Sequence, residues 1–225
     1  MSTISDHILV NNHHYIAFNK PGGMAVQSVQ NKDQSLEVLL HHYCKTHLFL
    51  IHRIDQPCSG LVLFAKKKST AQYFSEALQD QSIQRTYLAV TSEKPLEAEG
   101  TLFHYLFAHK KSNKSFVVDE NHKEGKASSL DFKYLSSTES GNHLIEINLK
   151  TGRHHQIRAQ LGAIHCPILG DLKYGSKQKR DDQSIALHAW KIKFRHPVDN
   201  KIMEITAPLP ENEHWAAIKQ IIATK

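Results

Sequence analysis

The chain has 225 residues, of which 40% are hydrophobic and 22% are charged, and this ordinary composition excludes a disordered or collagen-like protein. The net charge of +6 favours a polyanionic partner, although a basic surface kept for solubility explains the charge alone equally well. Residues 1–10 carry no signal-peptide pattern, and the longest strongly apolar run, residues 61–65, is far too short to cross a membrane. The three widely spaced cysteines predict reduced thiols, so we expect a cytoplasmic protein with no membrane contact.

In the first half of the chain, short apolar strands alternate with helices. Strands are predicted at residues 14–18, 48–51 and 61–65. One helix begins at Ser35, and a second is capped by Ser69.

In the second half, apolar and polar residues alternate in several short segments. This pattern predicts strands at residues 85–91, 127–135, 143–150 and 190–195. The chain closes with a helix at residues 211–223, which carries a stripe of apolar side chains. Because strands and helices do not alternate regularly, we predict an α+β fold with a mixed, largely antiparallel central sheet. No linker or internal repeat divides the chain, so a single domain is expected over residues 1–225.

Two polar segments between apolar elements could carry chemistry. The segment at residues 51–60 places charged side chains in a loop between two strands, although its Asp-x-Pro and Ser-Gly pairs are by themselves a turn signal. The segment at residues 151–158 places basic residues at the start of a predicted helix, which is typical of an anion site but also of a capped surface helix. Taken singly, neither segment decides between structure and function.

Other candidate sites are excluded by their spacing. The glycines at residues 170–175 resemble a phosphate-binding loop, but the following Ser and Lys stand in the reverse order. His41, Cys44 and His47 drift around a helix and have no fourth ligand nearby, so no metal site is predicted. No Gly-x-Ser-x-Gly motif marks a nucleophilic serine.

Taken together and in order, five motifs resemble the RluA family of pseudouridine synthases. They are Asn-Lys-Pro-Gly-Gly-Met at 19–24, His-Arg-Ile-Asp at 52–55 with Ser-Gly at 59–60, Arg-Thr-Tyr-Leu-Ala at 85–89, Gly-Arg-His-His-Gln-Ile-Arg at 152–158 and Pro-Ile-Leu-Gly-Asp at 167–171. The chain departs from the family pattern at Cys58, where Thr is usual, at Gln27 and at His154.

The resemblance implies an isomerase that converts uridine in RNA to pseudouridine, on the pseudouridine synthase fold with a basic RNA-binding cleft. It assigns the catalytic carboxylate to Asp55, with Arg158 as its ion-pair partner and Tyr87 against the uracil. Because Lys lacks the planar fork of a guanidinium, it would replace Arg158 poorly. The reaction needs neither a cofactor nor a metal, so none is expected.

The resemblance also implies contacts with RNA. A uridine in a structured RNA must be flipped out of its stack to reach a buried carboxylate, and Arg53 matches the family position that fills the vacated space. Further expected RNA contacts are His52, Arg153, Gln156 and Lys66. The partner is ribosomal RNA, transfer RNA or both, and the chain is expected to act as a monomeric catalytic core without an S4 domain.

Two other functions are compatible with parts of the sequence. A non-catalytic RNA-binding or ribosome-assembly factor on the same fold would keep the basic residues but would not isomerise uridine. A metal hydrolase would use some of the 17 histidines, and it would be expected to hold zinc.

Overall fold

The computed structural model describes residues 3–27, 35–180 and 182–223 of the chain. It contains two compact units, the first made of Met1–Arg85 and His188–Pro210 and the second of Thr86–Leu187 and Glu211–Lys225. Two of the three boundaries fall inside strands, at 85/86 and 187/188, and the prediction of one catalytic domain over the whole chain stays a prediction.

Strand β4 (Ser59–Ala65) is the centre of the first unit, and all seven of its residues are buried. Strands β2 (Tyr15–Lys20), β3 (Phe49–Leu50) and β10 (Leu187–Arg195) pair with it directly, β1 (Ile8–Asn11) pairs with β2, and β11 (Ile202–Thr206) pairs with β10. The pairing of β10 with β4 is parallel, and the other pairings in this unit are antiparallel. A strand covered on both faces needs apolar residues throughout, which explains the unbroken apolar run of β4.

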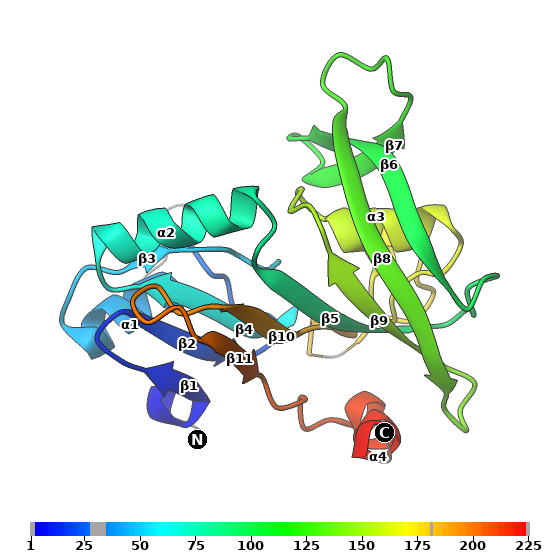
Figure 1. Cartoon of the computed structure of the whole chain (residues 1–225). Coiled ribbons are helices and arrows are strands. Elements are labelled where there is room, and N and C mark those ends of the chain that lie inside the picture. Colours follow the sequence, from blue (N-terminus) through cyan, green and yellow to red (C-terminus); the bar gives the residue numbers. More distant parts are fainter. Residues whose placement is uncertain (1–2, 28–34, 181, 224–225) are drawn as a thin grey trace. The chain divides into compact units, whose positions relative to one another are not determined.

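Two helices belong to the first unit (Figure 1). Helix α1 (Leu36–Cys44) begins where predicted, with the side chain of Ser35 accepting a hydrogen bond from the amide of Val38. Helix α2 (Lys68–Gln79) contacts β3 and β4. The predicted cap of α2 at Ser69 was wrong, because Lys67 occupies the N-cap position and its carbonyl already accepts from the amide of Ala71.

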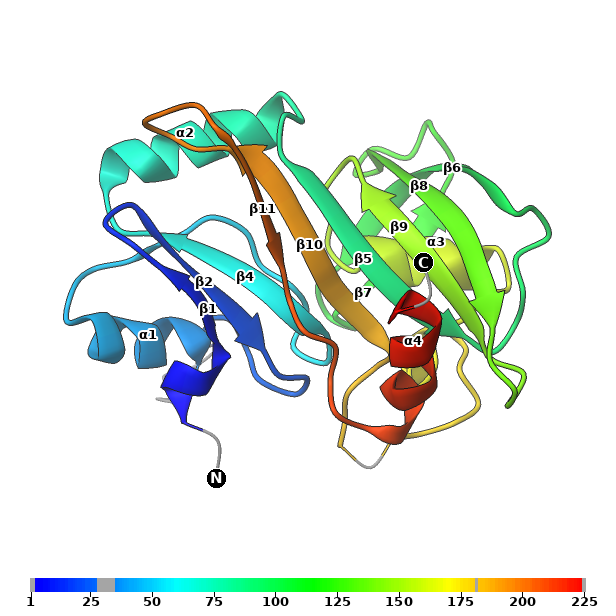
Figure 2. The same ribbon diagram turned by 60° about the horizontal axis from the view of Figure 1, so that its bottom comes forward.

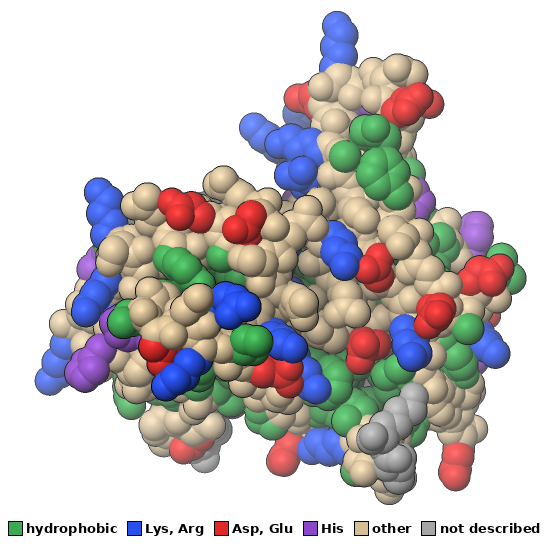
Figure 3. Space-filling model, in the orientation of Figure 1, with side chains coloured by type: hydrophobic (Ala, Val, Ile, Leu, Met, Phe, Trp, Pro, Cys, Tyr) green, Lys and Arg blue, Asp and Glu red, His purple; other side chains and the backbone are tan. Residues whose placement is uncertain are grey.

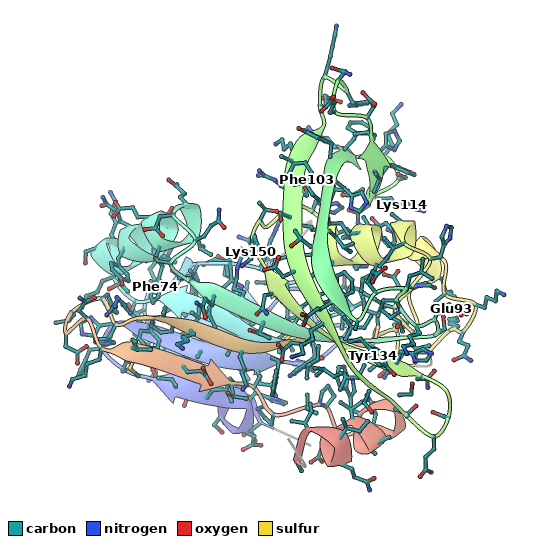
Figure 4. The ribbon with its side chains drawn as sticks, turned by 45° about the vertical axis from the view of Figure 1, so that its right-hand side comes forward. Phe74, Glu93, Phe103, Lys114, Tyr134 and Lys150 are labelled. Carbon is teal, nitrogen blue, oxygen red and sulfur yellow. The ribbon has the colours of Figure 1, made fainter. Side chains whose placement is uncertain are left out.

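Aromatic rings fill the core of the first unit on the side of α2. Phe74 of α2, labelled in Figure 4, lies with its ring centroid 6.0 Å from that of Tyr15 and 5.1 Å from that of Phe194. The rings meet edge to face, the arrangement that the charge distribution of aromatic rings favours. These contacts fix α2 on strands β2 and β10.

The second unit contains an antiparallel sheet (Figures 1 and 2). Its strands follow the order β5 (Gln84–Thr91), β9 (His143–Leu149), β8 (Lys126–Ser137), β6 (Glu99–His109) and β7 (Lys114–Val118). The predicted α+β class and the largely antiparallel pairing are therefore confirmed. Strands β6 and β7 were not predicted.

Helix α3 (Gln156–Ala163) contacts β6, β7 and the short 3₁₀ helix η2 (Leu172–Tyr174). Helix α4 (Glu213–Ala223) ends the described chain and buries Trp215 and Ile218, as its apolar stripe predicted. A second 3₁₀ helix, η1 (Ile4–His7), precedes β1. Among the described residues, no helix combines the length and apolar character that a membrane crossing requires.

Candidate active site

Asp55 lies in the loop that joins β3 to β4, in the first unit. The amide of Cys58 donates a hydrogen bond of 3.0 Å to the carbonyl of Asp55, which closes a tight turn through Pro57. Ile54 anchors the loop in the core with 7% of its surface exposed, whereas Arg53 is exposed. The turn therefore presents the half-buried carboxylate of Asp55 immediately before a rigid, buried strand.

The ammonium group of Lys20 binds backbone carbonyls of this turn. Four backbone carbonyl oxygens lie within 3.1 Å of Nζ of Lys20 and share its three N–H donors. These carbonyls belong to Pro21, Met24, Gln56 and Cys58. The side chain is completely buried, and burial lowers the pKa of Lys20 to about 8, against the opposing effects of Cys58 and Asp55. The motif at residues 19–24 contains Lys20, but the sequence does not indicate that this lysine holds the Asp55 loop.

His52 stands three residues before Asp55 and has an unusual environment. Both of its ring nitrogens are buried without a hydrogen-bond partner, as is Nε of the neighbouring Arg85. Burial, together with the positive charge of Arg85, lowers the pKa of His52 to about 3. The imidazole is therefore neutral at physiological pH.

Lys66 lies at the other end of β4 from Asp55. Its ammonium contacts Oδ1 of Asn11, and its amide donates to the carbonyl of His14. Because β4 is seven residues long, about 20 Å of extended strand separates the two sites. The structure thus gathers His52, Arg53 and Asp55 in one loop of the first unit but does not bring Lys66 to them.

In the second unit, Tyr87 is buried in β5, opposite Ile147 of β9, with 6% of its surface exposed. Arg158 projects from α3 and is 5% exposed. Its Nε and Nη2 donate to the two carboxylate oxygens of Asp171 over 2.7 and 2.9 Å. Sequence reasoning missed Asp171 as a partner, although the residue lies in one of the five motifs. The predicted ion pair between Asp55 and Arg158 would join the two units and stays a prediction.

The loop before α3 is held by the side chain of Gln156. Its Oε1 accepts hydrogen bonds from the hydroxyl of Thr151 and the amide of Arg153, while its Nε2 donates to the carbonyl of Ser129. Gln156 is 3% exposed, whereas Arg153 is exposed and its Nε donates to the carbonyl of Ala127. The buried side chain of Gln156 therefore fixes the loop, and the guanidinium of Arg153 is exposed on the loop surface.

Neither the histidines nor the surface charge marks a second kind of site. Nε2 of His41 lies 3.1 Å from the carbonyl and 3.0 Å from the amide of Leu48, so the backbone occupies it. Across the described ranges, no group of three His, Cys, Asp or Glu residues is arranged to hold a metal ion. On the face drawn in Figure 3, both Lys and Arg side chains and Asp and Glu side chains are present.

Comparisons with known proteins agree on one family. Residues 14–163 match the family described as RNA pseudouridylate synthase. Ribosomal large subunit pseudouridine synthase C of Rickettsia felis is 31% identical over 209 residues, which cover 92% of this chain and 68% of the relative. The uncharacterized RNA pseudouridine synthase YhcT of Bacillus subtilis is 29% identical over 219 residues, covering 90% of this chain and 68% of that protein.

A solved structure shares the fold. Human RNA pseudouridylate synthase domain containing 4 matches with a TM-score of 0.77 and 21% identity, covering 98% of this chain and 94% of that chain.

Proposed function

Since the chain belongs to the RNA pseudouridylate synthase family and is thus an isomerase that acts on RNA, we propose that Asp55 is its catalytic carboxylate. The observation that carries this proposal is the turn at the start of β4, where a half-buried carboxylate stands on a loop fixed by Cys58 and Lys20. A carboxylate held on such a scaffold reaches the sugar of a bound uridine in one orientation, which is what attack at C1′ or proton removal at C2′ requires.

Arg158 and Tyr87 complete the proposed site. A guanidinium beside Asp55 favours the charged carboxylate, and it opposes the cost of removing that carboxylate from water. Tyr87 offers an aromatic ring to the uracil, and base stacking of this kind contributes about 1–3 kcal/mol. Isomerisation breaks the N1–C1′ bond and forms a C5–C1′ bond in the same nucleotide, so the uracil must be retained between the two steps.

The proposed RNA contacts differ in kind. Arg53 is exposed beside the Asp55 turn, where its guanidinium stacks on the bases left behind when the uridine flips out. Arg153 and Lys66 bind phosphate groups. Both ring nitrogens of His52 are buried, so its imidazole offers no hydrogen bond to RNA, and Gln156 acts indirectly by holding the loop that carries Arg153.

Ribosomal RNA is the proposed substrate, because several similar relatives are named after the large ribosomal subunit. Transfer RNA is the second candidate. The experiment maps pseudouridines by carbodiimide primer-extension stops in total RNA from cells that lack the protein, and from the same cells supplied with wild type, Asp55→Asn or Asp80→Asn. Asp80 is an exposed carboxylate at the end of α2, so its variant controls for loss of a charge.

We expect a stop that disappears in the deletion and returns with wild type and Asp80→Asn but not with Asp55→Asn. The molecule that bears the stop identifies the substrate. A stop that returns with Asp55→Asn would exclude this residue as the catalytic group. A folded wild type that binds RNA but restores no stop would favour the non-catalytic RNA-binding factor.

A further inference from the structure

The guanidinium of Arg158 is held by an unusually complete set of contacts within the second unit. Asp171 receives two parallel hydrogen bonds from it, and only 1% of the Asp171 side chain is exposed. A carboxylate bonded by two nitrogens of a planar guanidinium fixes both its position and its plane. Nη1 of Arg158 must then point away from Asp171.

The ring of Tyr174 covers one face of the same guanidinium. Its centroid lies 5.1 Å from Cζ of Arg158, a cation–π distance. Lys114 of β7, labelled in Figure 4, places its ammonium 5.1 Å from the same ring. The tyrosine ring therefore lies against two cations, of which only Arg158 is buried.

The hydroxyl of Tyr174 has two hydrogen-bond partners. It accepts a hydrogen bond of 2.7 Å from the amide of Ser115, which leaves its hydrogen for Nδ1 of His155 at 3.0 Å. Burial and the charge of Arg158 lower the pKa of His155 to about 2, so its ring is neutral and accepts this hydrogen. The plane of the tyrosine ring is thereby fixed from β7 and from the start of α3.

The backbone around Asp171 and Tyr174 is built for close approach. Gly170 has φ +85°, and a Cβ there would lie 2.9 Å from the carbonyl oxygen of Ser184. A Cβ at Gly162 of α3 would lie 2.9 Å from the carbonyl oxygen of Tyr174, so glycine allows α3 to approach η2. Leu169 is paired to the sheet through hydrogen bonds of 2.9 Å with Val90 and Ala186. Both partners of Arg158 thus stand on rigid supports.

We propose that Asp171 and Tyr174 are positioning residues that aim the guanidinium of Arg158 at the catalytic carboxylate. This inference rests on the proposed role of Arg158 beside Asp55. Asp171 does not touch the RNA; it acts through Arg158 by occupying Nε and Nη2 and so directing Nη1. An ordinary buried ion pair would stabilise the fold in the same geometry, so the test must separate rate from stability.

The test measures single-turnover isomerisation of a substrate RNA by wild type, Asp55→Asn, Asp171→Asn and Asp182→Asn. Asp182 forms an arginine–aspartate pair with Arg180 at 3.2 Å. Its variant therefore removes a carboxylate from an arginine other than Arg158. RNA affinity and active fraction are measured for each protein.

We expect Asp171→Asn to lower the single-turnover rate constant by about 10²-fold, as a displacement of about 1 Å in an active site does. RNA affinity and the active fraction should remain close to wild type. Asp182→Asn should behave like wild type.

Two results would overturn the inference. One is an Asp171→Asn single-turnover rate constant equal to that of wild type. The other is a loss confined to the active fraction, which a structural role produces. Should Asp171→Asn fail to fold, Tyr174→Leu answers the same question, because it keeps the carboxylate but removes the ring. An active Asp55→Asn protein would instead contradict the proposed function itself, so the two failures are distinguishable.

Discussion

The ammonium nitrogen of Lys20 lies 2.6 Å from the carbonyl oxygen of Cys58, in a site closed to solvent. Through this bond and its bond to Gln56, a side chain of β2 determines where the turn bearing Asp55 stands. The contact links the motif at residues 19–24 to the motif at residues 52–60.

Replacing Lys20 by Met should therefore loosen the turn that bears Asp55. Methionine has a similar length but no donor, so the buried carbonyls lose their partner, and the free energy of unfolding should fall by about 3 kcal/mol. Isomerisation should slow as well. Chemical denaturation and single-turnover assays measure the two effects. Lys68→Met, at an exposed position of α2, should change neither, and a Lys20→Met protein as stable as wild type would contradict the role given to this ammonium.

Gly60 should not tolerate any side chain. Its φ is +109°, and a Cβ would lie 2.3 Å from the carbonyl oxygen of Ala189 in the neighbouring strand β10. Gly60→Ala should lower the free energy of unfolding by more than about 3 kcal/mol, because backbone strain and overpacking act together. Gly141→Ala is the control for strain alone, since Gly141 has φ +79° and nothing within 4 Å. It should cost about 1 kcal/mol, and equal losses for both variants would refute the steric explanation.

His188 should make stability depend on pH. Its Nε2 faces the carbonyl of Ala207, so Nδ1 accepts the hydrogen bond of 2.9 Å from the hydroxyl of Ser59. Burial lowers the pKa of His188 from 6.5 to about 4, so between these values the unfolded chain binds the extra proton. The free energy of unfolding should fall by about 3 kcal/mol as the pH drops through this window, and level off below it.

The measurement for His188 is urea unfolding at several pH values for wild type and His188→Gln. Other buried histidines titrate in both proteins, so the difference between the two curves isolates His188. Parallel curves between pH 6.5 and about 4 would show that this imidazole is not responsible.

Strands with one apolar face and one polar face could be predicted from the sequence. Strand β9 was predicted at 143–150 and lies at His143–Leu149, because its apolar and polar residues alternate along most of its length. Strand β6 escaped prediction, since Leu102 and Leu106 point to one face while Phe103 and Tyr105 point to the other, and both sets are apolar. A strand with large apolar residues on both faces gives no period-two signal.

The candidate site could likewise be predicted only in part. The motifs located the Asp55 loop and the start of α3, because their side chains are specific to each position. The partners of those side chains could not be found. Lys20 binds backbone carbonyls, which every residue has, and Asp171 reaches Arg158 across 13 positions of the chain through the turn at Gly170. Such contacts follow from the tertiary fold and leave no local pattern.

The length of strand β4 sets a requirement on the substrate. Asp55 lies in the turn before this strand and Lys66 directly follows it, so about 20 Å of extended strand lies between them, which is the span of several nucleotides. A short oligonucleotide centred on the target uridine can fill the catalytic turn without reaching Lys66. If Lys66 holds a phosphate group, trimming the RNA should raise KM well before it lowers kcat, so the smallest RNA that reacts and the smallest that binds tightly would differ in length.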